Sequence, residues 1–566
     1  MRYRTLLSML VLAAVLLAGP SSLFPPVQAN PQANWAPTET NLSDWQSGGI
    51  FDKRLILGQD DTQAAFWTTY DSTANQAALW GCVYPPGGGW TPAVNITGYH
   101  TPLGMTNPWD ASVTPDGTVW AMWVSYGTTN AYVHAAHFPP GGPWQSDDPT
   151  AQPGKYIKTA KMAVSPDGHL VIAWIDCAGA FITPCTVNVV RRFPGAPAWE
   201  PVEAIDNGLT SALIREDLFI LAGMGGETVV LWVQDDPNAP SGRGLFVRSF
   251  DPSSGTWSPP KTTPPISGWK SELSISQPVM FPNNTVVAAW RTHTADPNQW
   301  ANFSSTHIAG GTWSTPVQIS SIKSSAAYLA APKLAVGESG TTIAIWTEKS
   351  SISGNDLFAN ARDPGGVWGM ETNLSGHQDV IDDWHVGVWP NGDALAVWSI
   401  ENKTQPPNGD ECISWSMRLA NSLWGSGGQG NLGVWVESLG NLDLALDHNG
   451  NAVLAWGRKG NNGFESVQAA SWPSGGPWDS PTTISGDYTL TTVGDYGLVM
   501  GMEGQPVGVT WVAQSIVGYH KAVFYNEQII EPPSPTPTPT TGPTPTTGPP
   551  LPGSVQVYLP LVVRQP

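Results

Sequence analysis

The chain has 566 residues, including 60 Gly, 53 Pro and 29 Trp, and only 12% of its residues are charged. This length requires several domains or one large repetitive unit, and the composition favours many short strands joined by turns over helices. The net charge of -20, from 45 acidic and 25 basic residues, repels phosphate groups and argues against nucleic acid as a partner.

Residues 1–29 are typical of a secretory signal peptide. The basic residues Arg2 and Arg4 precede an apolar run over residues 6–18, and Val27-Gln28-Ala29 provides a small-residue cleavage site. The run is short for a membrane span, and no later stretch approaches the roughly 20 apolar residues that a spanning helix needs. We therefore expect an extracellular protein, secreted or attached to the cell surface, with no membrane insertion.

Residues 34–530 contain nine copies of one unit. Each has an alternating segment, a turn such as Asp167-Gly168 or Asn391-Gly392, and an apolar run that ends in Trp. These inner tryptophans recur at intervals of 51 to 58 residues, at Trp67, Trp123, Trp174, Trp232, Trp290, Trp346, Trp398, Trp456 and Trp511. A continuous apolar run predicts a strand buried on both faces, and the alternating segment predicts its hairpin partner, joined by a two-residue turn.

A second set of tryptophans marks the fourth, outer strand of each unit. The set is Trp90, Trp144, Trp199, Trp257, Trp313, Trp368, Trp424 and Trp478, which gives eight for nine units. The segment that begins at Trp35 stands alone before the first unit and matches the segment that begins at Trp368. We therefore predict that the N-terminal strand completes the last unit and closes a ring.

Four-stranded units of this length, repeated radially, resemble the β-propellers, and the Trp-containing hairpins resemble those of secreted bacterial sialidase-like propellers. The fold class expected is all-β, with a single β-propeller over residues 34–530. It has about nine four-stranded blades, or eight with one irregular repeat.

The resemblance implies a sialidase-like glycoside hydrolase as one function, but the sequence departs from that family's motifs. Asp and Gly are adjacent in Asp116-Gly117, whereas the sialidase Asp-box separates them by one residue. Sialidases also bind the sugar carboxylate with an arginine cluster. Here only Arg54 lies clearly on an inner strand, with Arg215 and Arg291 as distant candidates.

The C-terminal part changes composition. Residues 531–552 form a Pro/Thr-rich linker of the extended, polyproline type. Residues 553–566 form a short tail that resembles the C-termini of other secreted bacterial proteins and implies surface attachment; a dispensable apolar end is the alternative.

Candidate binding residues come from the innermost strands. Counting thirteen residues back from each inner tryptophan gives a mostly polar set that alternation turns toward the central channel. The charged members are Arg54, Asp110, Lys161, Lys333, His385 and Asp443, and two residues earlier on the same face lie Asp52, Asp217 and Asp383. They form either an axial binding site or a channel lining whose charges satisfy one another.

Several tryptophans belong to neither set and are expected in connections, mostly between blades. They are Trp109, Trp269, Trp300, Trp384 and Trp435. An exposed indole beside Asp110 or Asp383 could stack on a sugar ring, so Trp109, Trp269 and Trp384 are candidate glycan contacts. Anchors folded against the blades are the alternative.

Cysteine and metal signals are sparse. We expect a disulfide between Cys177 and Cys185, with four unpaired thiols as the alternative, because an exported chain permits a bridge across one loop. No cofactor is expected, although the acidic run at residues 235–238 offers oxygen ligands for calcium.

Together these features predict a monomeric, non-catalytic propeller that binds an extracellular glycan or protein. A sialidase-like glycosidase and a structural adhesion module are the alternatives.

Overall fold

The computed structural model describes most of the repeat region. The described residues are 34–36, 40–43, 49–71, 76–98, 108–127, 130–149, 156–179, 182–206, 214–235, 243–262, 269–294, 299–308, 311–324, 329–349, 354–376, 380–401, 411–436, 438–459, 465–485, 494–500, 507–514 and 521–529. The signal peptide, the Pro/Thr-rich linker and the C-terminal tail predicted from the sequence lie outside them.

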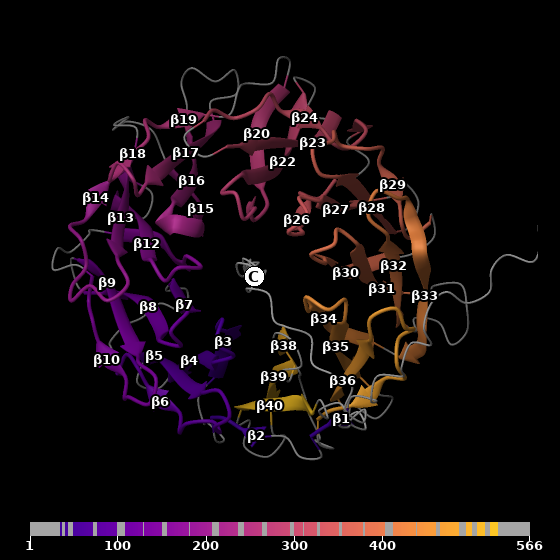
Figure 1. Ribbon diagram of the computed structural model, residues 1–566, viewed down its shortest axis with the longest axis horizontal. Coiled ribbons are helices and arrows are strands. Elements are labelled where there is room, and N and C mark those ends of the chain that lie inside the picture. The colour runs from indigo at the N-terminus through magenta and orange to yellow at the C-terminus, as the bar shows by residue number, and fades with distance from the viewer. Residues whose placement is uncertain are drawn as a thin grey trace, which may run out of the picture.

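Nine antiparallel sheets stand around a central axis as the blades of one β-propeller (Figure 1). The all-β fold and the nine blades are thus confirmed, and the eight-bladed alternative is wrong. In each blade the chain runs from the innermost strand outward, and blades 1 to 9 follow the chain from Gly49 to Ile529.

The innermost strands are β3 (Gly49–Leu57), β7 (Trp109–Val113), β11 (Tyr156–Val164), β15 (Ile214–Ala222), β20 (Trp269–Ile275) with β21 (Val279–Met280), β26 (Lys333–Val336), β30 (Val380–Val388), β34 (Ser438–Leu446) and β38 (Gly494–Met500). The second strands are β4 (Gln63–Asp71), β8 (Val119–Tyr126), β12 (Leu170–Gly179), β16 (Thr228–Asp235), β22 (Val286–Thr294), β27 (Thr342–Lys349), β31 (Ala394–Glu401), β35 (Ala452–Lys459) and β39 (Val507–Gln514).

The third strands are β5 (Gln76–Tyr84), β9 (Ala131–Phe138), β13 (Ile182–Arg192), β17 (Arg243–Asp251), β23 (Gln299–His307), β28 (Asn355–Arg362), β32 (Glu411–Arg418), β36 (Glu465–Trp472) and β40 (Lys521–Ile529). The outer strands are β6 (Val94–Asn95), β10 (Gln145–Ser146), β14 (Glu203–Ala204), β18 (Thr256–Trp257) with β19 (Lys261–Thr262), β24 (Val317–Gln318) with β25 (Lys323–Ser324), β29 (Thr372–Asn373), β33 (Trp424–Val436) and β37 (Thr482–Thr483). One 3-10 turn, η1 (Met224–Gly226), links β15 to β16.

The second strand of every blade is buried on both faces, as its sequence predicts. Val229, Val230 and Leu231 are fully buried in β16, and all nine inner tryptophans are at most 8% exposed. These strands pack against both neighbouring blades, and each hydrophobic cluster of the described residues joins two adjacent blades. The tryptophan lies within the strand and not at its end, since β12 continues past Trp174 to Gly179.

The turns between first and second strands are one residue longer than predicted. In blade 2 the Thr114 and Thr118 backbones pair, so three residues, Pro115, Asp116 and Gly117, form the loop. Gly117 has φ 80°, which supplies the left-handed residue that ends a three-residue loop. The Asp-Gly pair was correctly placed at the turn, but the proline before it belongs to the loop as well.

The ring closes through the N-terminal segment, as predicted. Strands β1 (Asn34–Trp35) and β2 (Thr40–Asn41) both pair antiparallel with β40 and complete blade 9. The Leu42 N–H donates to the Val523 carbonyl at 2.8 Å, and the Val523 N–H donates to Ser43 Oγ at 2.8 Å. The first described residues of the chain therefore serve as the outer strand of its last blade.

Cys177 and Cys185 form a disulfide that links β12 to β13 across their hairpin. The other two cysteines, Cys82 and Cys412, are buried and form no disulfide. No helix among the described residues has the length and apolar character to cross a membrane.

Candidate functional site

The predicted channel residues of blades 1 to 3 bind one another. The Arg54 guanidinium of β3 forms an ion pair with Asp110 of β7 and lies over the Trp109 ring, 4.5 Å from its centroid. The second Asp110 oxygen accepts the Met162 N–H of β11 at 3.0 Å. Burial lowers the pKa of the neighbouring Lys161, an effect that the Asp110 charge opposes. One carboxylate thus ties three consecutive inner strands together.

A similar arrangement joins blades 6 to 8. Asp383 of β30 accepts the Leu442 N–H of β34 at 2.9 Å and lies 3.6 Å from His385 Nε2. Lys333 of β26 donates to the Trp384 carbonyl at 2.8 Å, with its ammonium 4.7 Å from the Trp384 ring centroid. These contacts favour the alternative in which the inner-strand charges satisfy one another.

The predicted site residues therefore fall into separate groups. Arg54, Trp109, Asp110 and Lys161 lie together, whereas Lys333, Asp383, Trp384 and His385 lie in blades 6 and 7, on the other side of the ring (Figure 1). Asp443 lies in β34 of blade 8, where its carboxylate accepts the Leu444 N–H at 3.0 Å. Their role in ligand binding stays a prediction.

The expectation that the spare tryptophans lie in connections is wrong. Trp109 and Trp269 are the first residues of β7 and β20, and Trp300, Trp384 and Trp435 lie within β23, β30 and β33. Trp109 is only 6% exposed and packs with Phe66 of blade 1. The inner strands β7 and β20 begin earlier than the alternating segments suggest, so Trp109 and Trp269 belong to strands and not to the connections before them.

Bulges explain why simple alternation misplaces some inner residues. The pairing of first and second strands shifts register in β3, β11, β15, β20, β30, β34 and β38. In β30 the shift lies between Ile381 and Trp384, and it leaves Asp383 only 6% exposed. In β3 Asp52 is exposed, so Asp52 and Asp383 do not form one polar face with Arg54.

The three candidate arginines of the sialidase alternative come from three different blades and from different layers of the sheets. Arg54 lies in blade 1, Arg215 in β15 of blade 4, and Arg291 in β22 of blade 5. Arg291 donates to the Leu329 carbonyl at 2.6 Å. Arg54 forms an ion pair with Asp110, so binding a sugar carboxylate at Arg54 would require this pair to break.

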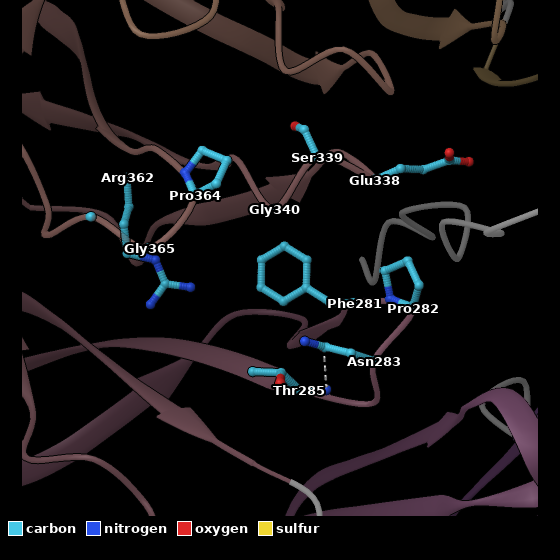
Figure 2. A pocket seen from close by; sticks show the side chains of 11 residues that line it. Phe281, Pro282, Asn283, Thr285, Glu338, Ser339, Gly340, Arg362, Pro364 and Gly365 are labelled. Atoms are coloured by element: carbon cyan, nitrogen blue, oxygen red, sulfur yellow. Dashed lines mark hydrogen bonds between the residues drawn. The ribbon is translucent and has the colours of Figure 1, made fainter. Parts of the chain in front are cut away.

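A cavity that sequence reasoning missed lies between blades 5 and 6. It measures about 480 Å³ and is lined by Phe281, Pro282, Asn283, Thr285, Glu338, Ser339, Gly340, Arg362, Pro364, Gly365 and Gly366. Three turns form it: the first-to-second-strand turns of both blades and the turn after β28 in blade 6. Figure 2 shows the Phe281 ring between Arg362 on one side and Glu338 on the other.

The walls of this cavity combine apolar rings with polar groups. The two prolines give apolar surface above Phe281, which is 7% exposed and belongs to the core between the two blades, while Asn283, Ser339 and Glu338 offer amide, hydroxyl and carboxylate groups. Glu338 Oε1 lies 3.1 Å from His448 Nε2, and this contact positions the carboxylate at the rim. The volume and this mixture suit one small polar ligand.

A hydroxyl, an imidazole and a carboxylate form a chain in blade 2. Ser125 Oγ lies 2.7 Å from His134 Nε2, and His134 Nδ1 lies 3.2 Å from Asp148 Oδ1. Burial acts to raise the pKa of Asp148, but the hydrogen bond from His134, the charge of His134 and the Ala135 N–H together lower it below its ordinary value. With Nδ1 protonated, Ser125 donates to Nε2, which is the order of groups that activates a serine nucleophile.

Strand register creates this chain, which explains why the sequence did not reveal it. In blade 1, Trp80 stands at the position of His134, and its indole donates to Thr69 Oγ1 at 3.0 Å. Thr97 Oγ1 accepts the N–H of Leu79, the residue before Trp80, whereas Asp148 accepts the N–H of Ala135, the residue after His134. Blade 2 replaces the aromatic ring with His and the capping hydroxyl with Asp.

No metal site emerges from the described residues, which contain no group of three or more His, Cys, Asp or Glu able to hold an ion. Most of the acidic run at residues 235–238 lies outside them, so the calcium expectation stays a prediction.

No protein-family model matches the sequence, and no curated protein matches it. Among solved structures, the chain is similar to polysaccharide lyase Uly1, with 10% identity over 77% of this chain and 93% of that one, at a TM-score of 0.39. It is also similar to the Hadza microbial sialidase Hz136, with 13% identity over 72% of each chain and a TM-score of 0.33. The β-propeller domain of the Trilobed protease from Pyrococcus furiosus gives 8% identity, 69% and 98% coverage, and a TM-score of 0.33. These values are too low to transfer a site or an activity.

Proposed function

We propose that this protein is an exported, non-catalytic propeller that binds carbohydrate in the cavity between blades 5 and 6. The observation that carries this proposal is the cavity itself, in which Pro282, Pro364 and the exposed edge of Phe281 provide apolar surface for a sugar ring and Asn283, Ser339 and Glu338 can bond its hydroxyls. The paired charges of the inner strands support a structural role there, which leaves the cavity as the better binding site.

The test blocks the cavity without touching the core. Ser339 is exposed on the rim, so Ser339→Trp fills the cavity with an indole. Asn449→Trp is the matched control, because Asn449 occupies the same turn position in blade 8 and is also exposed. A glycan array identifies sugars bound by the full chain, and calorimetry then measures both variants.

The expected result is loss of sugar binding in Ser339→Trp and unchanged binding in Asn449→Trp. If the chain binds no glycan on the array, or if Ser339→Trp binds as well as the unmodified protein, the cavity is not a carbohydrate site.

A second candidate function, ester hydrolysis, is favoured by the Ser125–His134–Asp148 chain. Ser125 Oγ would attack the acyl carbon as its proton passes to His134 Nε2, the alcohol would leave with that proton, and water would release the acid from the acyl-serine. A fluorophosphonate probe should label Ser125, with labelling lost in Ser125→Ala and reduced in His134→Gln. An unlabelled native protein would show that the three groups are only a structural hydrogen-bond chain.

A further inference from the structure

Arg362 stands out in the cavity because its positive charge is not compensated. Its Nη1 and Nη2 atoms donate to Thr306 Oγ1 at 2.8 Å and to Thr342 Oγ1 at 3.3 Å, and the guanidinium lies 5.8 Å from the Trp368 ring centroid. No carboxylate of the described residues pairs with it. Burial lowers the pKa of Arg362, and no acidic group opposes that effect.

The equivalent arginine of the next blade has the carboxylate partner that Arg362 lacks. Arg418 closes β32 as Arg362 closes β28, and each pairs in the backbone with a tryptophan six residues later. Arg418 Nη2 lies 2.6 Å from Asp363 Oδ2, and Asp363 directly follows the third strand of the preceding blade. In the blade that precedes Arg362, the residue directly after the third strand is Ile308, which is 61% exposed. The equivalent position of the preceding blade is therefore an aspartate for Arg418 and an isoleucine for Arg362.

A half-buried cation without a carboxylate partner is costly, because the charge loses water without gaining an opposite charge. The two threonine hydroxyls fix the guanidinium and occupy two of its five N–H groups. A planar guanidinium matches the two oxygens of a carboxylate in a bidentate pair. A doubly charged phosphate is disfavoured by a single arginine in a chain of net charge -20.

We infer that the sugar bound in this cavity is acidic and that Arg362 binds its carboxylate. This inference rests on the proposed carbohydrate function and narrows the ligand to a uronic acid unit. Phe281 lies between the arginine and Glu338, so a sugar that spans the cavity over Phe281 places its carboxylate at Arg362 and its hydroxyls toward Glu338 (Figure 2).

The experiment compares methyl glycosides that differ only in charge. Calorimetry with the full chain measures methyl glucuronide and methyl galacturonide against methyl glucoside and methyl galactoside, with glucose 6-sulfate and an acetylated aspartyl peptide as further probes. The variants are Arg362→Met, Ile308→Asp, which restores the absent acid, and Ile308→Asn as its uncharged partner. Arg418→Met is the control for loss of an arginine at the same repeat position.

The expected result is binding of a uronide that weakens by about 10- to 100-fold in Arg362→Met, as for loss of a charged hydrogen-bonded pair. Ile308→Asp should weaken it similarly, because the new carboxylate competes for Arg362, while Ile308→Asn and Arg418→Met bind as before. Uronide affinity that persists in Arg362→Met, or stronger binding of the sulfate or the peptide, overturns the inference.

Two failures are distinguishable. If neutral glycosides bind as tightly as uronides and Ser339→Trp removes both, the carbohydrate function stands and the role of Arg362 is wrong. If neither class binds, the carbohydrate function fails and the inference fails with it.

Discussion

Replacing Asp110 with Ala should destabilise the ring at its inner edge. Asp110 is 9% exposed and accepts from Arg54, from its neighbour Ala111 and from Met162 of the next blade. Removing one partner of a buried, hydrogen-bonded ion pair costs about 3–5 kcal/mol, because the other charge stays buried without compensation. The measurement is urea unfolding followed by tryptophan fluorescence, with the loss read from the transition midpoint.

Two variants separate the charge from the hydrogen bonds. Asp110→Asn keeps an acceptor for the Met162 N–H and should lose less stability than Asp110→Ala. Adding Arg54→Met to Asp110→Asn removes the stranded cation and should restore part of the loss, with a coupling of about 0.5–3 kcal/mol. The reasoning is refuted if Asp110→Ala unfolds at the same urea concentration as the unmodified protein but loses affinity for its ligand, since Asp110 would then be a binding residue.

Three further outcomes are expected. Leu42→Ala combined with Ser43→Ala should cost about 3–8 kcal/mol, from the lost apolar burial and an unsatisfied strand N–H; an unchanged urea midpoint would mean that the N-terminal strand does not hold the ring closed. Cys82 and Cys412 should resist a thiol reagent until the protein unfolds, because both are buried and burial raises the pKa of Cys82; rapid labelling of the native protein would contradict this. The lowered pKa of Asp148 stabilises the folded protein above the unfolded-state pKa of about 3.9, and this stabilisation disappears as pH falls through the folded-state pKa. Asp148→Asn should therefore flatten the acid side of the curve of unfolding free energy against pH. An unchanged acid slope would show that Asp148 does not contribute to the acid dependence.

The repeat pattern was sufficient to predict the fold because its signal is local. An apolar run that must be buried on both faces recurs nine times, and the unmatched segment at Trp35 has only one blade to complete. The pattern was insufficient for the inner strands, where bulges break the alternation and place Asp383 in a backbone contact with Leu442.

The uncompensated charge of Arg362 could not be predicted from a single repeat, for a different reason. Arg362 and Arg418 look alike within their own repeats, and the difference lies in the preceding repeat, where one meets Ile308 and the other meets Asp363. A comparison of each position with its neighbour across the blade interface would have shown the uncompensated charge before any coordinates were known.

The closing of the ring also sets an order of events during biosynthesis. Ser43 and Val523 are 480 positions apart, so the partner of β2 is among the last parts of the propeller to be made. Until β40 arrives, the N-terminal strands have no sheet to join, and a chain cut short before blade 9 would leave an apolar sheet face uncovered at each end of its blade array. Such a fragment should aggregate, which makes completion of the polypeptide a condition for a soluble product.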